Sequence, residues 1–228
     1  SWVRGCRVNG EDQWDKFLDA AAREFVEEEG AAGGVMAKWL QFHRLVPNYY
    51  LQYYYCTQVV LEELKSKPTT RGEKVVELEK TLFEKYKDPN LKEKPKELEE
   101  RGGAFYSTAA CNLIESLVSD KQDVQIVNVR NGDTVPELPP EVSVEVPCTI
   151  TKAGPIPLKQ RPLEPEIRGI LQVVKAYEEL TVEAAVHGDR RSALLALSVH
   201  PLVRQIEMLE PLLEEILQEN REFLPQFD

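Results

Sequence analysis

A change in hydrophobic periodicity near residue 124 constrains the fold most. From there to residue 151, apolar and polar residues alternate, first at Val124, Ile126 and Val129 and then, after an Asn131-Gly132 turn, over 142–146. Period-two alternation is typical of strands, whereas apolar residues on both sides of this segment recur at helical spacing. We therefore expect one α+β domain over 1–228, dominated by helices with a small mixed sheet.

The helical segments have recognisable ends. A glycine-rich break at 30–34 should separate the first two helices, Pro47 can lie in the first turn of the third, and Pro68-Thr69-Thr70 should cap the fourth. Segment 104–120 mixes small and apolar residues, so we expect a buried helix, whereas the polar stretch 87–103 should be an exposed connection. The expected helices cover 11–29, 35–44, 47–64, 71–86 and 104–120, followed by three after Glu164 that Gly188 and Pro201 separate.

Charge and hydropathy exclude some partners. A formal net charge of −11 and a pI near 5.0 argue against nucleic acid, because phosphate backbones are bound by clustered Lys and Arg. No apolar run approaches the roughly 18 to 20 residues that cross a bilayer, and no basic leader precedes a short apolar segment. We expect a cytoplasmic protein with neither a nucleic-acid nor a membrane partner.

The cysteines and glycines carry no recognisable cofactor motif. The four cysteines, Cys6, Cys56, Cys111 and Cys148, lack the CxxC spacing of a local metal site. We expect them to be reduced and buried, although a disulfide pair remains open from the sequence. The glycine pairs at 33–34 and 102–103 do not form GxGxxG after a strand, so they offer no nucleotide-binding loop.

Five of the eight tyrosines fall within VPNYYLQYYY, residues 46–55. Tyr50, Tyr53 and Tyr54 share one face if the segment is helical, so amphipathic packing is one explanation. A chemical role is the other. Periodicity alone does not decide between them.

Six segments of the chain carry a resemblance to a known family. They are SWVRGCRVNGEDQW, VPNYYLQYYY, TTRGEKVVELEKTLFEKY, RGGAFYSTAA, VQIVNVRNGDTVPELPPEVSVEVP and SALLALSVHPLV. These segments resemble family 4 of the glycoside hydrolases, particularly its 6-phospho-β-glucosidases. The resemblance implies a fold similar to the C-terminal domain of lactate and malate dehydrogenases, preceded by a dinucleotide-binding domain that this chain lacks. The chain also starts without Met inside a strand-like pattern, which indicates further sequence upstream.

The resemblance implies an unusual glycosidase chemistry that uses NAD and a divalent metal, usually Mn²⁺. NAD⁺ takes hydride from C3 of the sugar, a base removes the acidified C2 proton, the C1–O bond breaks, water adds, and hydride returns. The nucleotide loop and metal ligands should lie upstream. This chain alone is therefore expected to hold neither cofactor tightly and to be inactive.

The family's base is a tyrosine, which corresponds to Tyr50. A free phenol has a pKa near 10, so a nearby cation or donor must stabilise the phenolate. Arg71 corresponds to a family arginine that reaches the substrate. The turn that includes Asn128 and Arg130 is a further candidate for binding sugar hydroxyls. Tyr49, Tyr53, Tyr54 and Tyr55 are expected to be mainly structural.

Several alternatives stay open. The α-specific members carry an acidic residue about five positions before the tyrosine, where this chain has Leu45, which favours a β-glucoside. A 6-phospho-α-glucosidase, an α-galactosidase and a non-catalytic helical oligomerisation module are the alternatives. The expected partners are a phosphorylated disaccharide or glucoside, the chain's own N-terminal domain and further copies of itself. None of His43, His187 and His200 lies in a triad or metal spacing; His187 should cap a helix and His200 should be structural.

Overall fold

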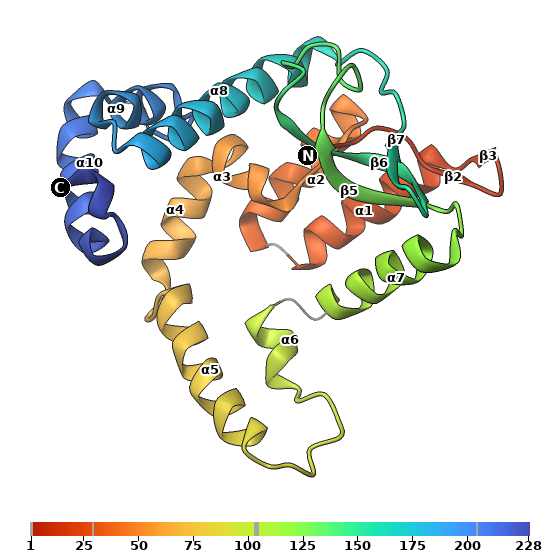
Figure 1. Cartoon of the computed structure of the whole chain (residues 1–228), viewed down its shortest axis with the longest axis horizontal. Coiled ribbons are helices and arrows are strands. Elements are labelled where there is room, and N and C mark those ends of the chain that lie inside the picture. Colours follow the sequence, from red (N-terminus) through yellow and green to blue (C-terminus); the bar gives the residue numbers. More distant parts are fainter. Residues whose placement is uncertain (1, 29, 103–104, 204) are drawn as a thin grey trace. The chain divides into compact units, whose positions relative to one another are not determined.

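The structure, a computed structural model, describes residues 2–28, 30–102, 105–203 and 205–228 (Figure 1). Helices dominate and the strands are few, which confirms the expected α+β class. The chain forms two compact units: Ser1–Asp123 with Ile150–Gly154 make unit 1, and Val124–Thr149 with Pro155–Asp228 make unit 2. That 1–228 acts as one domain downstream of a nucleotide-binding domain stays a prediction.

Short antiparallel strands open unit 1. β1 (Trp2–Val3) pairs with β4 (Val46–Pro47), and β2 (Arg7–Val8) pairs with β3 (Glu11–Asp12). The β2–β3 turn has φ of 52° at Asn9 and 85° at Gly10, the left-handed pair that two-residue hairpins favour. Pro47 is the last residue of β4 and does not lie in the first turn of a helix. The expectation for Pro47 was therefore wrong.

Two helices build the first core cluster. α1 (Trp14–Glu28) packs on α2 (Gly30–His43). The expected glycine break is shorter than predicted, because α2 starts at Gly30 and Gly33 is buried inside it. Burial of Met36 and Leu40 along the same helix outweighs the roughly 1 kcal/mol that a glycine costs within a helix. The buried cluster comprises Leu18, Ala21, Ala22, Ala37, Leu40 and Val46.

The tyrosine segment is interrupted where one helix was expected. It forms a 3₁₀ turn, η1 (Tyr49–Leu51), followed by α3 (Gln52–Tyr55) and α4 (Thr57–Ser66). Cys56, with φ of −123°, separates the two α-helices. Its side chain is buried with Ala32, Met36 and Val60, so the break follows from packing against α2.

Three more helices complete unit 1. α5 (Arg71–Tyr86) begins with a capping box between Thr70 and Glu73, which confirms the predicted cap. The polar connection holds only the short α6 (Glu97–Arg101), which contacts α5. α7 (Tyr106–Ser119) buries a single residue, Ser116. The prediction of a buried helix here was wrong.

Unit 2 contains most of a three-stranded sheet in the order β5-β6-β7. β5 (Val124–Arg130) pairs antiparallel with β6 (Ser143–Thr151), and β7 is Gly154–Pro157. Both strands lie where the alternation predicted them. In β6 the apolar residues Val144 and Val146 are buried, whereas in β5 Val124 and Ile126 are 58% and 66% exposed.

The C-terminal helices follow the predicted order. They are α8 (Pro165–His187), α9 (Arg190–Val199) and α10 (Leu209–Glu219), with 3₁₀ turns η2 (Ile206–Met208), η3 (Arg221–Phe223) and η4 (Pro225–Phe227). Gly188, with φ of 65°, caps α8, while His187 is its last helical residue beside Glu183. Within the described residues, no helix is long and apolar enough to cross a membrane.

His200 ends α9 in a half-buried position. Its ring packs edge-on against Tyr177 with centroids 4.5 Å apart, and its Nδ1 accepts a hydrogen bond from the Leu202 N–H at 3.2 Å. Burial lowers the pKa of His200 from its ordinary 6.5. These contacts fit the structural role expected from the sequence.

The lowered pKa of His200 predicts a pH dependence of stability. Below 6.5 the unfolded chain binds a proton that the folded chain resists, so stability contributed by neutral His200 is present above that pH and is lost as pH falls through the folded pKa. We expect the thermal midpoint of the wild type to fall more between pH 7 and pH 5 than that of His200→Gln. Parallel slopes in the two proteins would contradict this assignment.

Candidate active site

Tyr50 is presented on the surface by a capped 3₁₀ turn. Asn48 caps η1, because its Oδ1 accepts the Tyr50 N–H at 2.9 Å and its backbone O accepts the Leu51 N–H at 2.9 Å. The side chain of Tyr50 is outside the core, and the residue is 70% exposed. A general base must reach the proton that it abstracts, and an exposed phenol on a capped turn is accessible to a ligand.

The neighbouring tyrosines are packed more closely. The Tyr53 ring lies nearly parallel to that of Tyr50, with centroids 6.4 Å apart, and Tyr49 meets Tyr50 edge-on at 5.5 Å. Tyr53 and Tyr55 pack against the Cys56 cluster, and Tyr55 also lies 4.8 Å from Trp39. These contacts agree with the structural role predicted for them. Tyr50 differs by its greater exposure.

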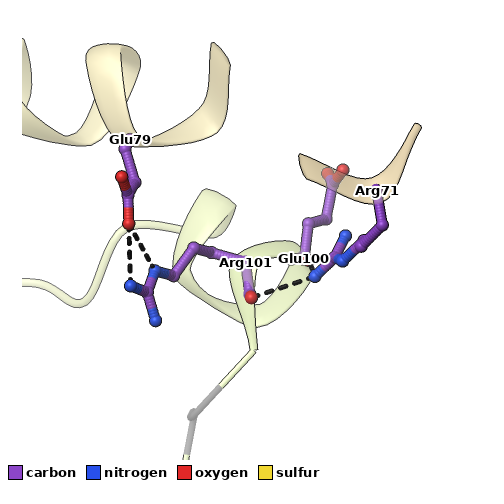
Figure 2. A network of polar contacts seen from close by, with 4 residues as sticks. All are labelled: Arg71, Glu79, Glu100 and Arg101. Carbon is purple, nitrogen blue, oxygen red and sulfur yellow. Dashed lines mark hydrogen bonds and ion pairs between the residues drawn. The ribbon is translucent and has the colours of Figure 1, made fainter. Parts of the chain in front are cut away.

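Arg71, the first residue of α5, forms hydrogen bonds with the end of α6 (Figure 2). Its Nη2 donates to the carbonyl oxygens of Glu100 at 2.7 Å and Arg101 at 2.9 Å. Arg101 in turn binds Glu79 of α5 through Nη2 at 2.7 Å and Nε at 3.2 Å. Two arginines thus hold the end of α6 against α5. No pattern in the sequence indicated this role for Arg71.

Substituting Arg71 should loosen the end of α6. Lysine keeps the charge but lacks the planar guanidinium, so Arg71→Lys is expected to hold these two carbonyls poorly. We expect backbone amides of 97–102 to exchange hydrogen several-fold faster in Arg71→Lys. Lys74→Gln is the control, because Lys74 is an exposed neighbour whose 3.7 Å ion pair with Glu100 should contribute little. Unchanged exchange in Arg71→Lys, or an equal increase in Lys74→Gln, would refute this role.

Asn128 and Arg130 lie on the exposed face of β5 in unit 2, whereas Tyr50 and Arg71 belong to unit 1. In the antiparallel register, Asn128 faces Glu145 and Arg130 faces Ser143. The Nε of Arg130 donates to the Pro140 carbonyl at 3.4 Å. Both side chains are accessible to a ligand. Their substrate contacts remain a prediction.

Asn131 has an importance that the sequence did not reveal. It is 1% exposed, and its Nδ2 donates to the carbonyls of Val135, Leu138 and Pro139 at 2.9–3.0 Å. Its Oδ1 accepts the Val135 N–H at 2.8 Å. Asn131 therefore organises the loop between β5 and β6 from inside. The adjacent glycine hid this role, because Asn-Gly already explains a turn.

The described residues hold neither a cluster of metal ligands nor a glycine-rich nucleotide loop. Among the described residues, no group of three or more His, Cys, Asp or Glu could hold a metal ion. Gly33 and Gly34 lie inside α2, while Gly103 of the second glycine pair falls outside the described residues. All four cysteines are free; Cys56 and Cys148 are buried as expected, but Cys111 is exposed. Burial raises the pKa of Cys56 and of Cys148, so neither is a prepared thiolate ligand.

Other residues singled out in the sequence lie in packed positions. Leu45 is 3% exposed, so a carboxylate could not replace it without being buried. His43 lies between Trp39, with centroids 4.2 Å apart, and Phe42, at 4.9 Å. This aromatic packing accounts for His43 without catalytic work.

Comparison with known proteins identifies the family. The profile of the family 4 glycosyl hydrolase C-terminal domain matches residues 1–203. A probable 6-phospho-β-glucosidase of Bacillus subtilis is 42% identical over 93% of this chain and 52% of its own length. A 6-phospho-α-glucosidase of Leptotrichia buccalis is only 25% identical, over 79% of this chain and 41% of its own.

A solved structure agrees with these sequences. The 6-phospho-β-glucosidase of Thermotoga maritima, determined with manganese, NAD⁺ and glucose-6-phosphate, superposes with a TM-score of 0.86 at 34% identity. The alignment covers 98% of this chain and 52% of that protein. The fold of the chain therefore agrees with its match to the C-terminal domain of this family. The chain belongs to family 4 of the glycosyl hydrolases and spans about half the length of the curated relatives it matches.

Proposed function

We propose that this chain is the C-terminal half of a 6-phospho-β-glucosidase. The observation that carries the proposal is the gap between 42% identity to a probable 6-phospho-β-glucosidase and 25% identity to a 6-phospho-α-glucosidase. Buried Leu45, where the α-specific pattern has an acid, supports the same anomer. The substrate is a 6-phospho-β-glucoside, cleaved to glucose 6-phosphate and an alcohol or sugar.

The proposal divides the chemistry between two halves of the protein. NAD and manganese accompany the T. maritima enzyme, but the described residues of this chain hold no cluster for a metal. We assign both groups to the N-terminal half, where NAD supplies reversible oxidation of the sugar. Without that half, this chain is inactive.

This chain contributes the base and part of the substrate surface. The exposed side-chain oxygen of Tyr50 takes the proton from C2 of the sugar. Both hydrogen bonds of Arg71 use Nη2, which leaves Nε and Nη1 for a sugar or phosphate oxygen. Asn128 and Arg130 provide further donors from β5.

The enzyme's location and self-association are part of the same proposal. A phosphorylated sugar is charged and does not cross a membrane unaided, so it stays inside the cell. We therefore place the enzyme in the cytoplasm. The C-terminal helices carry Leu194, Leu195, Leu197, Leu209, Leu212 and Ile216 in close succession. We infer self-association through these helices; sedimentation at tens of micromolar that detects only monomer would exclude it for this chain.

The substrate assignment can be tested with the full-length protein. The p-nitrophenyl derivatives of 6-phospho-β-glucoside, its α-anomer and unphosphorylated α-galactoside are supplied in separate assays at equal concentrations with NAD⁺ and Mn²⁺. We expect release of p-nitrophenol from the β-anomer alone. Preference for the α-anomer or for an unphosphorylated galactoside would instead indicate the other activities of this family.

A further inference from the structure

Helix α7 has two apolar faces, although one is enough for a helix at a protein surface. Leu113 and Leu117 are half-buried on the side of Ser116. A second stripe repeats at helical spacing on another side. It consists of Ala110, Cys111, Ile114 and Val118, which we call the outer stripe.

The outer stripe is open to solvent. Ile114 is 60% exposed and Val118 is 77% exposed, and the exposed Phe105 and Tyr106 precede them at the start of the helix. Most of the polar side chains lie on the remaining side, at Thr108, Asn112, Glu115 and Ser119; Ser107 interrupts the outer stripe in the first turn, and Ser116 lies on the buried side. A helix that is apolar over most of its circumference is normally covered on more than one side.

The energetics of α7 also favour a missing contact. Isolated helices of this length, fourteen residues, are marginal in water, so most of their stability comes from packing. α2 has the same length and buries five residues, whereas α7 buries one. The outer stripe would supply the packing that α7 lacks.

We propose that the outer stripe of α7 is the surface against which the N-terminal half of the enzyme packs. The inference rests on the proposed function, because it requires that half to exist. Relatives extend over about twice the length of this chain. Upstream sequence would enter at β1, and β1 belongs to unit 1, as α7 does.

The covalent connection favours this occupant over a second copy. A tethered half meets unit 1 at an effective concentration near the millimolar range, whereas a free copy meets it at its bulk concentration. The stripe also suits a protein surface. Ala110 and Cys111 are small and permit close approach, and Ile114 and Val118 can fill grooves of an opposing helix.

Cys111 provides a direct probe of the stripe, because Cys56 and Cys148 are buried and Cys6 is half-buried. The 228-residue chain and the full-length protein are each treated with a thiol reagent, and labelling of the Cys111 peptide is followed by mass spectrometry. We expect labelling to be at least about tenfold slower in the full-length protein. The labelling rate does not depend on activity. The proposed contact can therefore fail while the proposed glycosidase activity holds, and the activity can fail while the contact holds.

Other labelling results would overturn the proposal. Equal rapid labelling in both proteins would show that the stripe stays open. Slow labelling of the 228-residue chain in dilute solution would show that the chain covers its own stripe. Protection of that chain that increases with its concentration would show that a second copy is the occupant.

Matched substitutions test the same surface by stability. Ile114→Glu should lower the thermal midpoint of the full-length protein by several degrees while changing that of the 228-residue chain little, because the residue is exposed there. Val182→Glu, on α8 at 62% exposure against 60% for Ile114, should be tolerated in both. An equal fall for Ile114→Glu in both proteins, or none in either, would contradict the proposed contact.

Discussion

Tyr50→Phe in the full-length enzyme is expected to reduce turnover of a 6-phospho-β-glucoside by roughly 100-fold or more, the usual effect of losing a positioned base. Phenylalanine keeps the ring and its stacking on Tyr53 but has no oxygen to accept the C2 proton. Stability should change little, because the residue is 70% exposed. NAD⁺ and metal binding should persist, and exchange of the C2 proton with solvent deuterium should fall together with turnover.

Tyr53→Phe is the matched control. Tyr53 belongs to the same segment and stacks on Tyr50, so this variant perturbs the aromatic cluster and leaves the proposed base in place. It should keep most of the activity and of the C2 exchange. A large loss in Tyr53→Phe, with Tyr50→Phe nearly as active as the wild type, would mean that Tyr53 is the base and Tyr50 is not.

Asn131→Asp should have the largest effect on stability. The amide Nδ2 of Asn131 donates to three carbonyls in a buried site, and a carboxylate would face the same oxygens with no proton to donate. Unsatisfied buried acceptors cost about 1–3 kcal/mol each, so we expect the free energy of unfolding to fall by roughly 3 kcal/mol after partial relaxation. Urea unfolding of the 228-residue chain measures the change.

Asn128→Asp provides the same chemical change three residues away. Asn128 is exposed on β5, and substitutions at such positions usually alter stability by less than about 0.5 kcal/mol. The difference between the two variants isolates the buried hydrogen bonds. If Asn131→Asp were as stable as Asn128→Asp, the loop would not depend on the Asn131 amide.

Local signals in the sequence were sufficient for most of the secondary structure. The capping residues of α5, the Gly188 stop and the alternation in β6 depend on neighbouring residues, so they could be recognised without tertiary information. Most of the failures concern packing, and Pro47 lies in a strand because it pairs with Trp2. Burial decided where α2 begins and broke the tyrosine helix at Cys56. The outer stripe of α7 led to the wrong prediction of a buried helix. Apolar residues indicate that a surface is covered, but they do not identify what covers it.

The candidate site was predictable to a different extent at each residue. Tyr50 could be singled out only by resemblance, since helical spacing alone did not distinguish it from Tyr53. The contacts of Arg71 with Glu100 and Arg101 join residues about thirty positions apart, and no local pattern encodes them. The loop role of Asn131 depends on carbonyls whose direction only the fold determines.

Reconstitution from separate halves tests the central claim most directly, namely that this chain supplies the base and the N-terminal half supplies the cofactor and metal. The 228-residue chain, wild type or Tyr50→Phe, is mixed with the separately produced N-terminal half, NAD⁺, Mn²⁺ and p-nitrophenyl 6-phospho-β-glucoside. We expect neither half to release p-nitrophenol alone, the wild-type mixture to do so, and the Tyr50→Phe mixture to remain inactive. Hydrolysis by the 228-residue chain alone, or by the mixture that contains Tyr50→Phe at the wild-type rate, would contradict this division.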